Sequence, residues 1–411
     1  MTIVADLLMK KLILLLPLAI LTMVSCSNDE QAGSLQKEVT VRPLVNSNTR
    51  GESVTLANLG TFRVYGVNAD AANPAIEADF TDLVSPQADG STWTMQGVHY
   101  WMVDPVSKEP SYGANVVNFT GIYPKDLVTS ATLPASVDLN LNTNNGRDLD
   151  DILVAYYSAT RNDNLISGVP LNFKHVLSQI VVRAANGHID ERKVEIIGVK
   201  LSNVKPEGTL TFPTSNTIGN TAFNPISNPS GTPVSYIIKH TNGEAVTLSE
   251  NVQNVMFDGQ YAGGFMVIPQ SFTCTQGQPL TIQASDTYIS VLCRIYGKNS
   301  ADEWELIYPK KGEDGKYGFA SVGISGTWEP GKKYIYTLNF YEDNGGAGLI
   351  DPNPVDPDDP DNPEVDTSPD DEDAPTGIVD DEQAKTPITF TVSVEDWQDG
   401  SGSDSDFNKI M

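Results

Sequence analysis

Residues 388–395 read Ile388-Thr389-Phe390-Thr391-Val392-Ser393-Val394-Glu395, and apolar and polar side chains alternate along them without a break. Because successive side chains of a β-strand point to opposite faces, this period of two predicts a strand with one wholly apolar face. Such a face must be covered by another part of a protein. The stretch therefore indicates β-structure and marks a strand that packs onto a partner.

A second alternating stretch lies near the other end of the chain, at residues 37–45. Val39, Val41, Pro43 and Val45 share one face, and polar residues occupy most of the other. Pro43 has no N–H to give to a ladder, so it confines this strand to an edge or an irregular position. The polar residues 46–52 that follow are predicted to form a loop.

The residues between these two stretches predict an all-β protein. Short apolar runs recur from Phe62 to Phe340 and are separated by Pro, Gly, Asn and Asp, as in β-sandwiches. With 411 residues, the chain exceeds the size at which a single core usually keeps growing. We therefore expect two β-sandwiches in tandem, with a boundary near Ser167.

The first residues carry the signature of an exported lipoprotein. Lys10 and Lys11 precede an apolar run that ends in Met23-Val24-Ser25-Cys26. This order of charged, apolar and cysteine-containing segments predicts a signal peptide, residues 1–25, that is cut before a lipid-bearing Cys26. An ordinary secretory signal with a chance cysteine is the alternative. The run is too short for a spanning helix, and no later segment approaches the roughly 20 apolar residues that a bilayer demands.

Negative charge is concentrated in one segment. The net charge of the chain is −27, and the stretch from Glu342 to Glu382 contributes −16 of it, with 16 acidic residues and no basic one. Its repeated Asp-Pro units predict a disordered, extended linker. A calcium site is the alternative, but the stretch lacks the glycine hinge and the closing Glu of an EF-hand loop. No basic cluster suggests nucleic-acid binding.

The residue types of common catalytic and metal sites are sparse. The four histidines have no metal-ligand spacing, and there is no nucleophile elbow or phosphate-binding glycine loop. We expect no cofactor, no metal and no enzyme. Carboxylates brought together only by the fold, as in glycosidases, stay open. His175 is expected to lie between strands with its ring bonded to a backbone carbonyl.

Two groups of side chains have alternative explanations. The aromatic residues Trp93, Tyr100, Trp101 and Tyr112 either fill the first core or stack on a sugar. Cys274 and Cys293 either form a disulfide or are two buried thiols, and two cysteines alone favour the thiols.

Several motifs, taken in order, resemble those of the fimbrillin (Mfa-like) family, the pilins and accessory pilins of Bacteroidetes type V pili. They are Cys26, the strand at 37–45, the pair Thr49-Arg50 before Gly51, Phe62 to Tyr65, Leu171 to Ile180, Trp328 to Phe340 and Val392 to Trp397. The resemblance implies tandem transthyretin-like β-sandwiches in a lipoprotein of the cell outer membrane. It also implies trimming after Arg50 by a trypsin-like protease, which removes the acylated (for example palmitate-bearing) Cys26 and the first strand with Val39, Val41 and Val45.

These expectations define a domain plan and a function. The plan is a signal peptide at 1–25, a tether and removable strand at 26–50, sandwiches at 51–167 and 168–340, an acidic linker at 341–387, and a strand with a tail at 388–411. Ile388, Phe390, Val392 and Val394 are the expected donor residues that replace the lost strand in another pilin subunit.

The acidic insertion is larger than the family pattern of a stalk subunit, which favours an accessory or tip pilin in a cell-surface fimbrium, with a ligand on a host or bacterial surface. An anchor subunit would instead keep Cys26. The alternative is a surface glycan-binding lipoprotein that keeps its lipid.

Overall fold

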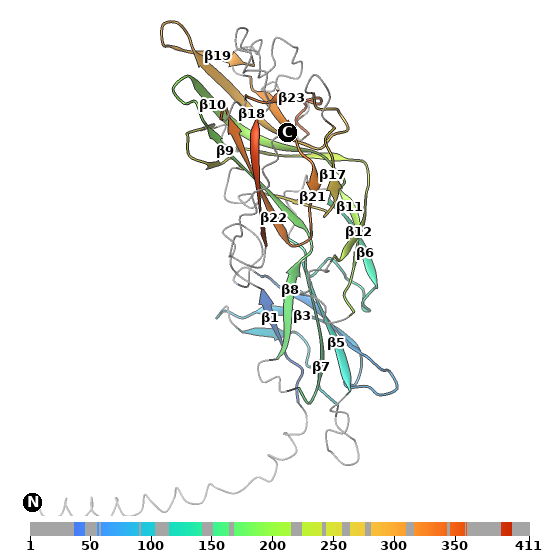
Figure 1. Cartoon of the computed structure of the whole chain (residues 1–411). Helices are drawn as coiled ribbons and strands as arrows, with labels where there is room; N and C mark the ends of the chain where they lie inside the picture. Colours follow the sequence, from blue (N-terminus) through green and yellow to red (C-terminus); the bar gives the residue numbers. More distant parts are fainter. Residues whose placement is uncertain are drawn as a thin grey trace, which may run out of the picture.

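The computed structural model describes residues 37–45, 56, 59–89, 92–102, 115–141, 151–163, 168–214, 224–240, 244–256, 264–275, 281–309, 316–342, 346–357, 359 and 388–396. Every long element among these residues is a β-strand. The strands form two sandwich-like bodies stacked along the long axis of the molecule, with the N-terminal body at the bottom of the view (Figure 1). Across the described residues, no helix has the length and apolar character needed to cross a membrane.

The N-terminal body contains one curved sheet of seven strands in the order β1-β8-β7-β5-β2-β3-β4. The strands are β1 Val41–Val45, β2 Phe62–Asn68, β3 Phe80–Pro86, β4 Trp93–Met95, β5 Val116–Tyr123, β7 Leu153–Thr160 and β8 Val169–His175. All neighbours are antiparallel except β1 and β8, which run parallel. Phe62, Phe119 and Phe173 are fully buried in the core that the curved sheet encloses.

Two sheets face each other in the C-terminal body. One has the order β13-β10-β18-β20-β23, with β14 on β10 and β19 on β18, and the other has the order β15-β9-β22-β24, with β16 on β9. The strands of the first are β10 Arg192–Val204, β13 Val234–Lys239, β14 Val246–Thr247, β18 Tyr288–Lys298, β19 Trp304–Tyr308, β20 Gly318–Gly323 and β23 Leu349–Ile350. Those of the second are β9 Ser178–Asn186, β15 Gln253–Asn254, β16 Phe265–Val267, β22 Lys332–Phe340 and β24 Thr389–Asp396. A short pair, β17 Ser271–Phe272 and β21 Gly326–Thr327, stands apart.

A third sheet joins the two halves of the chain. It has the order β12-β11-β6, and its strands are β6 Ser136–Asn140, β11 Glu207–Thr211 and β12 Ile226–Ser230. A separate apolar cluster lies at this junction, with Tyr65 and Ile122 from the N-terminal body and Leu210 and Met266 from the C-terminal half. The two bodies therefore share a buried apolar interface.

Two features of the domain plan differ from the sequence-based expectation. The predicted boundary near Ser167 is too early, because β8 pairs with β7 and β1 and so belongs to the N-terminal sheet. The linker predicted from residue 341 is not extended over its first part. We call residues 346–357 the strap: they contain β23 on β20 and bury Asp351 and Asp356 against the C-terminal body. The reason is that both carboxylates pair with lysines, buried Lys200 and partly exposed Lys239.

Candidate functional site

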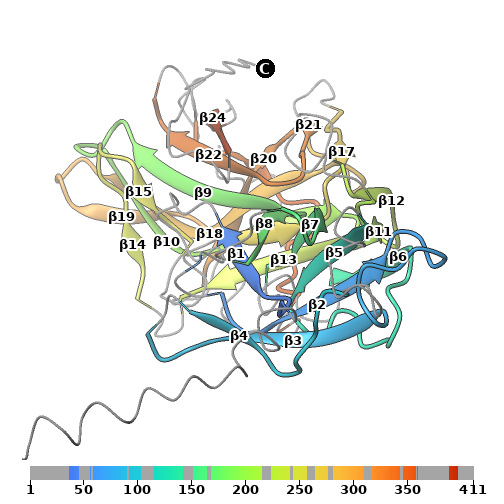
Figure 2. The ribbon, with the colours of Figure 1, turned by 90° about the horizontal axis from the view of Figure 1, so that it is seen from below.

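The strand β1 lies at one end of the N-terminal sheet and pairs there with β8. Its five residues lie opposite residues 169–173 in a parallel register. The N–H of Val169 donates to the carbonyl of Thr40 over 2.7 Å, one residue before β1 begins. Figure 2 shows β1 beside β8, with β4 at the far end of the same sheet.

The residues before β1 connect this edge of the sheet to the chain that follows β4. The N–H of Val39 donates to the carbonyl of His99 over 2.7 Å, and the N–H of Trp101 donates to the carbonyl of Lys37 over 2.9 Å. Residues 37–45 thus bond to β8 on one side and to residues 99–101 on the other. We call residues 37–45 the seam, because they close the curved sheet on itself.

The seam also covers the core below it. Val39, Val41 and Val45 are 1%, 5% and 6% exposed, and they pack in the same apolar cluster as Phe119 and Phe173. The predicted alternation of residues 37–45 is therefore confirmed. Without the seam, this part of the core would meet water, and Val169, Trp101 and His99 would each lose a backbone hydrogen-bond partner.

Two glycines shape the wall against which the seam packs. A Cβ on Gly168 would lie 3.0 Å from the backbone carbon of Thr40, and the φ of Gly168 is +86°. A Cβ on Gly121 would lie 2.7 Å from the ring of Phe173. Both glycines thus leave space that a side chain would fill.

Pro43 stands where its missing N–H costs no ladder bond. The carbonyl of Thr40 faces β8, and backbone polar groups alternate in direction along a strand, so the nitrogen of Pro43 faces away from β8. A proline at this position gives the outer edge of β1 one donor fewer for an unwanted partner.

The strand expected to be the donor, β24, is seated in the C-terminal body of its own chain. It pairs antiparallel with β22 over eight residues, from Lys332 opposite Asp396 to Asn339 opposite Thr389. Figure 2 shows β24 beside β22. Ile388 is 2% exposed in the C-terminal core, and Phe390, Val392 and Val394 are half-buried against that core. The predicted apolar face is confirmed, and its partner is β22.

A family model described as fimbrillin-like matches residues 49–351, which is more than half of the chain. The chain belongs to the fimbrillin-like family. Membership supports a pilin-like role in adhesion, assembly with other pilin subunits and a place in a cell-surface fimbrium. Curated protein sequences gave no match.

Solved structures similar to this fimbrillin-like protein include three bacterial proteins. A putative cell adhesion protein of Bacteroides uniformis is 13% identical with a TM-score of 0.43, covering 88% of this chain and 99% of its own. A fimbrial protein of Bacteroides vulgatus is 15% identical with a TM-score of 0.45, covering 74% and 95%. The tip fimbrial protein Mfa3 of Porphyromonas gingivalis, truncated at its C-terminus, is 10% identical with a TM-score of 0.37, covering 75% and 96%. Likeness at this level carries no argument about function.

The predicted signal peptide 1–25, the predicted loop at 46–52 and several candidate site residues lie outside the described residues. These site residues are Cys26, Arg50, Gly51 and Tyr112. Lipidation at Cys26 and cleavage between Arg50 and Gly51 stay predictions.

The aromatic residues of the first body divide between core and surface. Trp101 is 3% exposed in the core, and the ring of Trp93 lies 5.6 Å from that of Phe62. Tyr100 is 42% exposed and Val98 is 59% exposed, both beside the seam. The core explanation holds for Trp101, whereas Tyr100 faces outward among the described residues of this group.

The histidine and cysteine side chains considered as candidate catalytic groups lie in buried or partly buried positions. His175 pairs through its Nδ1 with the buried carboxylate of Asp151, a partner that we did not expect from the sequence. Cys274 and Cys293 are free thiols, and burial raises the pKa of Cys274 to about 12. Among the described residues, no three His, Cys, Asp or Glu side chains group as a metal site would require.

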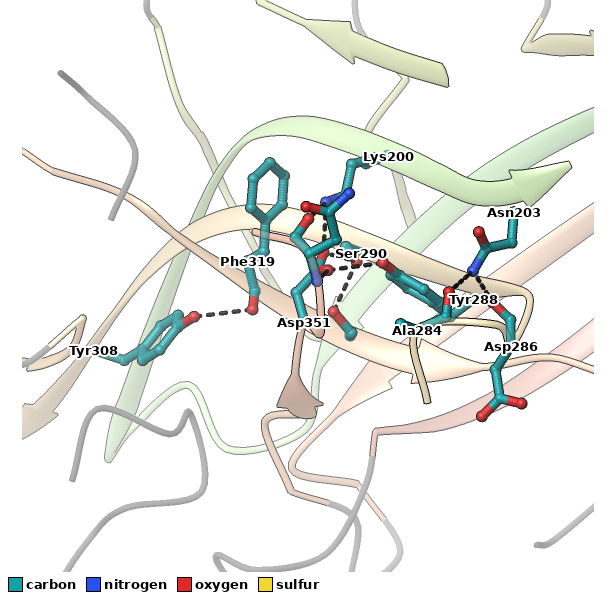
Figure 3. A network of polar contacts seen from close by, with 11 residues as sticks. Lys200, Asn203, Ala284, Asp286, Tyr288, Ser290, Tyr308, Phe319 and Asp351 are labelled. Atoms are coloured by element: carbon teal, nitrogen blue, oxygen red, sulfur yellow. Dashed lines mark hydrogen bonds and ion pairs between the residues drawn. The ribbon is translucent and has the colours of Figure 1, made fainter. Parts of the chain in front are cut away.

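Sequence reasoning missed a buried polar network under the strap (Figure 3). Asp351 lies 2.7 Å from the Nζ of Lys200, and both side chains are buried. The same carboxylate accepts hydrogen bonds from the hydroxyls of Tyr288 (2.8 Å) and Ser290 (2.7 Å) and from the N–H of Asn353 (2.8 Å). The pKa of Lys200 is lowered, chiefly because burial disfavours its charge. Lys200 sits in β10 among apolar residues, and that position was the only signal in the sequence.

Proposed function

We propose that this protein is an accessory or tip subunit of a type V fimbria that assembles by donor-strand exchange. In this proposal Cys26 carries the lipid that holds the exported precursor at the outer membrane. A trypsin-like protease cuts after Arg50, which releases the lipid together with the seam. The trimmed subunit then joins other pilin subunits and contributes to adhesion.

The observation that carries the proposal is the position of the seam. It directly precedes the predicted loop at 46–52, and it closes the N-terminal sheet. Each buried polar group left without a partner costs about 1–3 kcal/mol, and each apolar side chain that leaves the core costs about 1.5–3 kcal/mol. Cleavage would thus turn a closed sheet into a groove that a foreign strand can fill.

β24 matches the groove in spacing. The seam buries residues at alternate positions from Val39 to Val45, and β24 presents Ile388, Phe390, Val392 and Val394 at the same intervals. Four such side chains contribute roughly 6–12 kcal/mol before ordering costs. β24 must first leave β22. Assembly is therefore driven only by the difference in binding free energy between the N-terminal groove and the edge of β22.

Limited trypsin digestion of the chain from residue 27 onward tests this proposal. We expect a new N-terminus at Gly51 and detergent-resistant oligomers that form only after the cut. An Arg50→Ala variant is the control, and it should keep the seam and stay monomeric. Quantitative release of residues 27–50 that leaves a stable monomer at high concentration would contradict the proposal.

A surface glycan-binding lipoprotein is the second candidate, and the exposure of Tyr100 beside Val98 favours it. Exposed aromatic rings stack on sugars at low entropic cost. In that case the chain on cells keeps Cys26 and residues 37–45, and Tyr100→Ala abolishes binding on a glycan array. Retained binding in Tyr100→Ala, with Gly51 at the N-terminus of the surface form, would exclude it.

A further inference from the structure

The edge of β22 is a long, well-defined seat for a β-strand. Tyr334, Tyr336 and Leu338 lie opposite Val394, Val392 and Phe390 and face the core with them. The rings of Tyr336 and Phe390 have centroids 6.1 Å apart.

The start of the strap forms the end of this seat. Ala347 is fully buried in the core, and a Cβ on Gly348 would lie 3.0 Å from the Cδ1 of Ile388. Ile388 therefore fits against a glycine that leaves it just enough room.

The strap is fixed by bonds that do not involve β24. Asp351 is bound to Lys200, Tyr288 and Ser290 of the facing sheet, as Figure 3 shows, and Asp356 is paired with Lys239. Lys200 also donates to the carbonyl of Asn353 over 2.6 Å. The wall beside Ile388 thus has its own anchor, and the seat keeps this wall when β24 leaves.

After trimming, a subunit has more strand-binding edges than strands to fill them. The two edges, here called seats, are that of β8, which β1 fills, and that of β22, which β24 fills. The precursor has two seats and two strands, since the seam fills the first seat and β24 the second. If the seam is lost, as the proposed function requires, each subunit keeps two seats but only one strand. A subunit that donates β24 to a neighbour leaves the edge of its own β22 open, with its core exposed.

We propose that the edge of β22 is a second strand-acceptor site, which binds the β24 strand of another copy of this chain. The contacts that such a strand makes are the same as those within one chain, because the residues are the same. This proposal rests on the proposed function, because the edge of β22 becomes free when β24 is donated to a neighbouring subunit. The site itself is present before any cleavage.

The chemistry of the seat defines which strands fit. An occupant needs a large aliphatic residue for the space beside Gly348, followed by apolar residues at every second position. An acidic residue at its far end is also favourable: Lys333 lies opposite Glu395, and burial lowers the pKa of Lys333 while the Glu395 carboxylate opposes this lowering. The strand at 388–395 meets all these requirements.

Disulfide trapping between two singly substituted chains tests the proposal. Thr337 and Thr391 lie directly opposite each other on the face away from the core, within the Cβ distance that a disulfide can span. One chain carries Thr337→Cys and the other Thr391→Cys, both begin at residue 27 so that Cys26 is absent, and both carry Cys274→Ser. A mixture of the two should form disulfide-linked dimers on oxidation. Because the chain's own strand is covalently linked to its site, it competes at an effective concentration of the order of millimolar, and the dimer yield should rise about tenfold or more between ~10 µM and ~1 mM protein.

Two controls keep the result interpretable. A single chain with both Thr337→Cys and Thr391→Cys should close an internal disulfide, which shows that the pair can bond. Asn339→Cys mixed with Thr391→Cys places the cysteines on a diagonal and should give several-fold less dimer, since diagonal Cβ atoms are about 7–8 Å apart.

The outcomes separate this inference from the proposed function. Internal closure without dimers in the mixture, at every concentration, would overturn the second acceptor site. Equal yields from the matched and diagonal pairs would also overturn it, because they indicate random collision. Neither result bears on oligomers formed after cleavage at Arg50, which report on the N-terminal groove.

Discussion

At the scale of single residues, the packing beneath the seam depends on two glycines. Gly121 in β5 leaves room for the ring of Phe173, which lies in β8 directly beside β1. Gly168 does the same for the backbone at Thr40. The pairing of β1 with β8 therefore depends on two positions that carry no side chain.

Gly121→Ala is expected to destabilise the N-terminal body by about 1–3 kcal/mol. The new Cβ would lie 2.7 Å from the Phe173 ring, and overpacking of this kind exceeds the 0.5–1 kcal/mol that alanine gains over glycine in a strand. Urea unfolding measures the change. Gly60→Ala is the matched control, since its Cβ would make an ordinary contact with Tyr123 at 3.6 Å, and it should not lower stability. Equal effects of the two substitutions would show that crowding at Phe173 is not the cause.

At the scale of elements, ion pairs and hydrogen bonds of Asp351 and Asp356 fix the strap. The adjoining strands are instead stabilised mainly by apolar packing. In the strap, Asp351 accepts bonds from Lys200 of β10 and from Tyr288 and Ser290 of β18, and these side chains are buried. Burial of a lysine is costly unless its charge is paired and hydrogen-bonded, so each partner in this network depends on the other.

Lys200→Met is expected to cost about 3–5 kcal/mol of unfolding free energy, because it leaves the Asp351 carboxylate buried without its cation. Thermal or urea unfolding gives the value, and proteolysis within the strap should accelerate. Lys193→Met is the control: its pair with Glu195 at 3.0 Å is partly exposed, so the loss should be at most about 1 kcal/mol. Comparable losses in both variants would argue against a buried ionic anchor.

At the scale of the whole molecule, the C-terminal body gathers buried tyrosines that keep their protons. Burial raises the pKa of Tyr334 to about 12, and the same cause raises the pKa of four others. They are Tyr236, Tyr288, Tyr336 and Tyr341. Tyr334 and Tyr336 belong to β22, the strand that forms the seat of β24.

The raised pKa values of these buried tyrosines predict that the C-terminal body loses stability at alkaline pH. An unfolded tyrosine loses its proton near pH 10, whereas folded Tyr334 holds its proton up to about pH 12. The stability present below pH 10 is therefore lost as the pH rises through this window. Tyrosinate absorbance, followed together with near-UV circular dichroism, should show ionisation and unfolding in one step. Tyr334→Phe should make the stability profile flatter between pH 10 and 12, and an unchanged profile would contradict the assignment.

The alternating residues by themselves determined much of the fold and of the candidate site. Val39, Val41 and Val45 and the apolar residues from Ile388 to Val394 predict two strands with one buried face each, because burial of one face is a local pattern with a period of two. The family resemblance is confirmed by the match over residues 49–351.

Only the tertiary structure decided which surface each strand covers. An apolar face fits any groove of suitable width, and the choice of β8 for β1 and of β22 for β24 depends on hydrogen bonds between residues far apart in the chain. The same reason explains the two errors in the domain plan. β8 looks the same in sequence whichever body it joins, and an Asp-Pro segment reads as disordered until Lys200 and Lys239 are brought beside it.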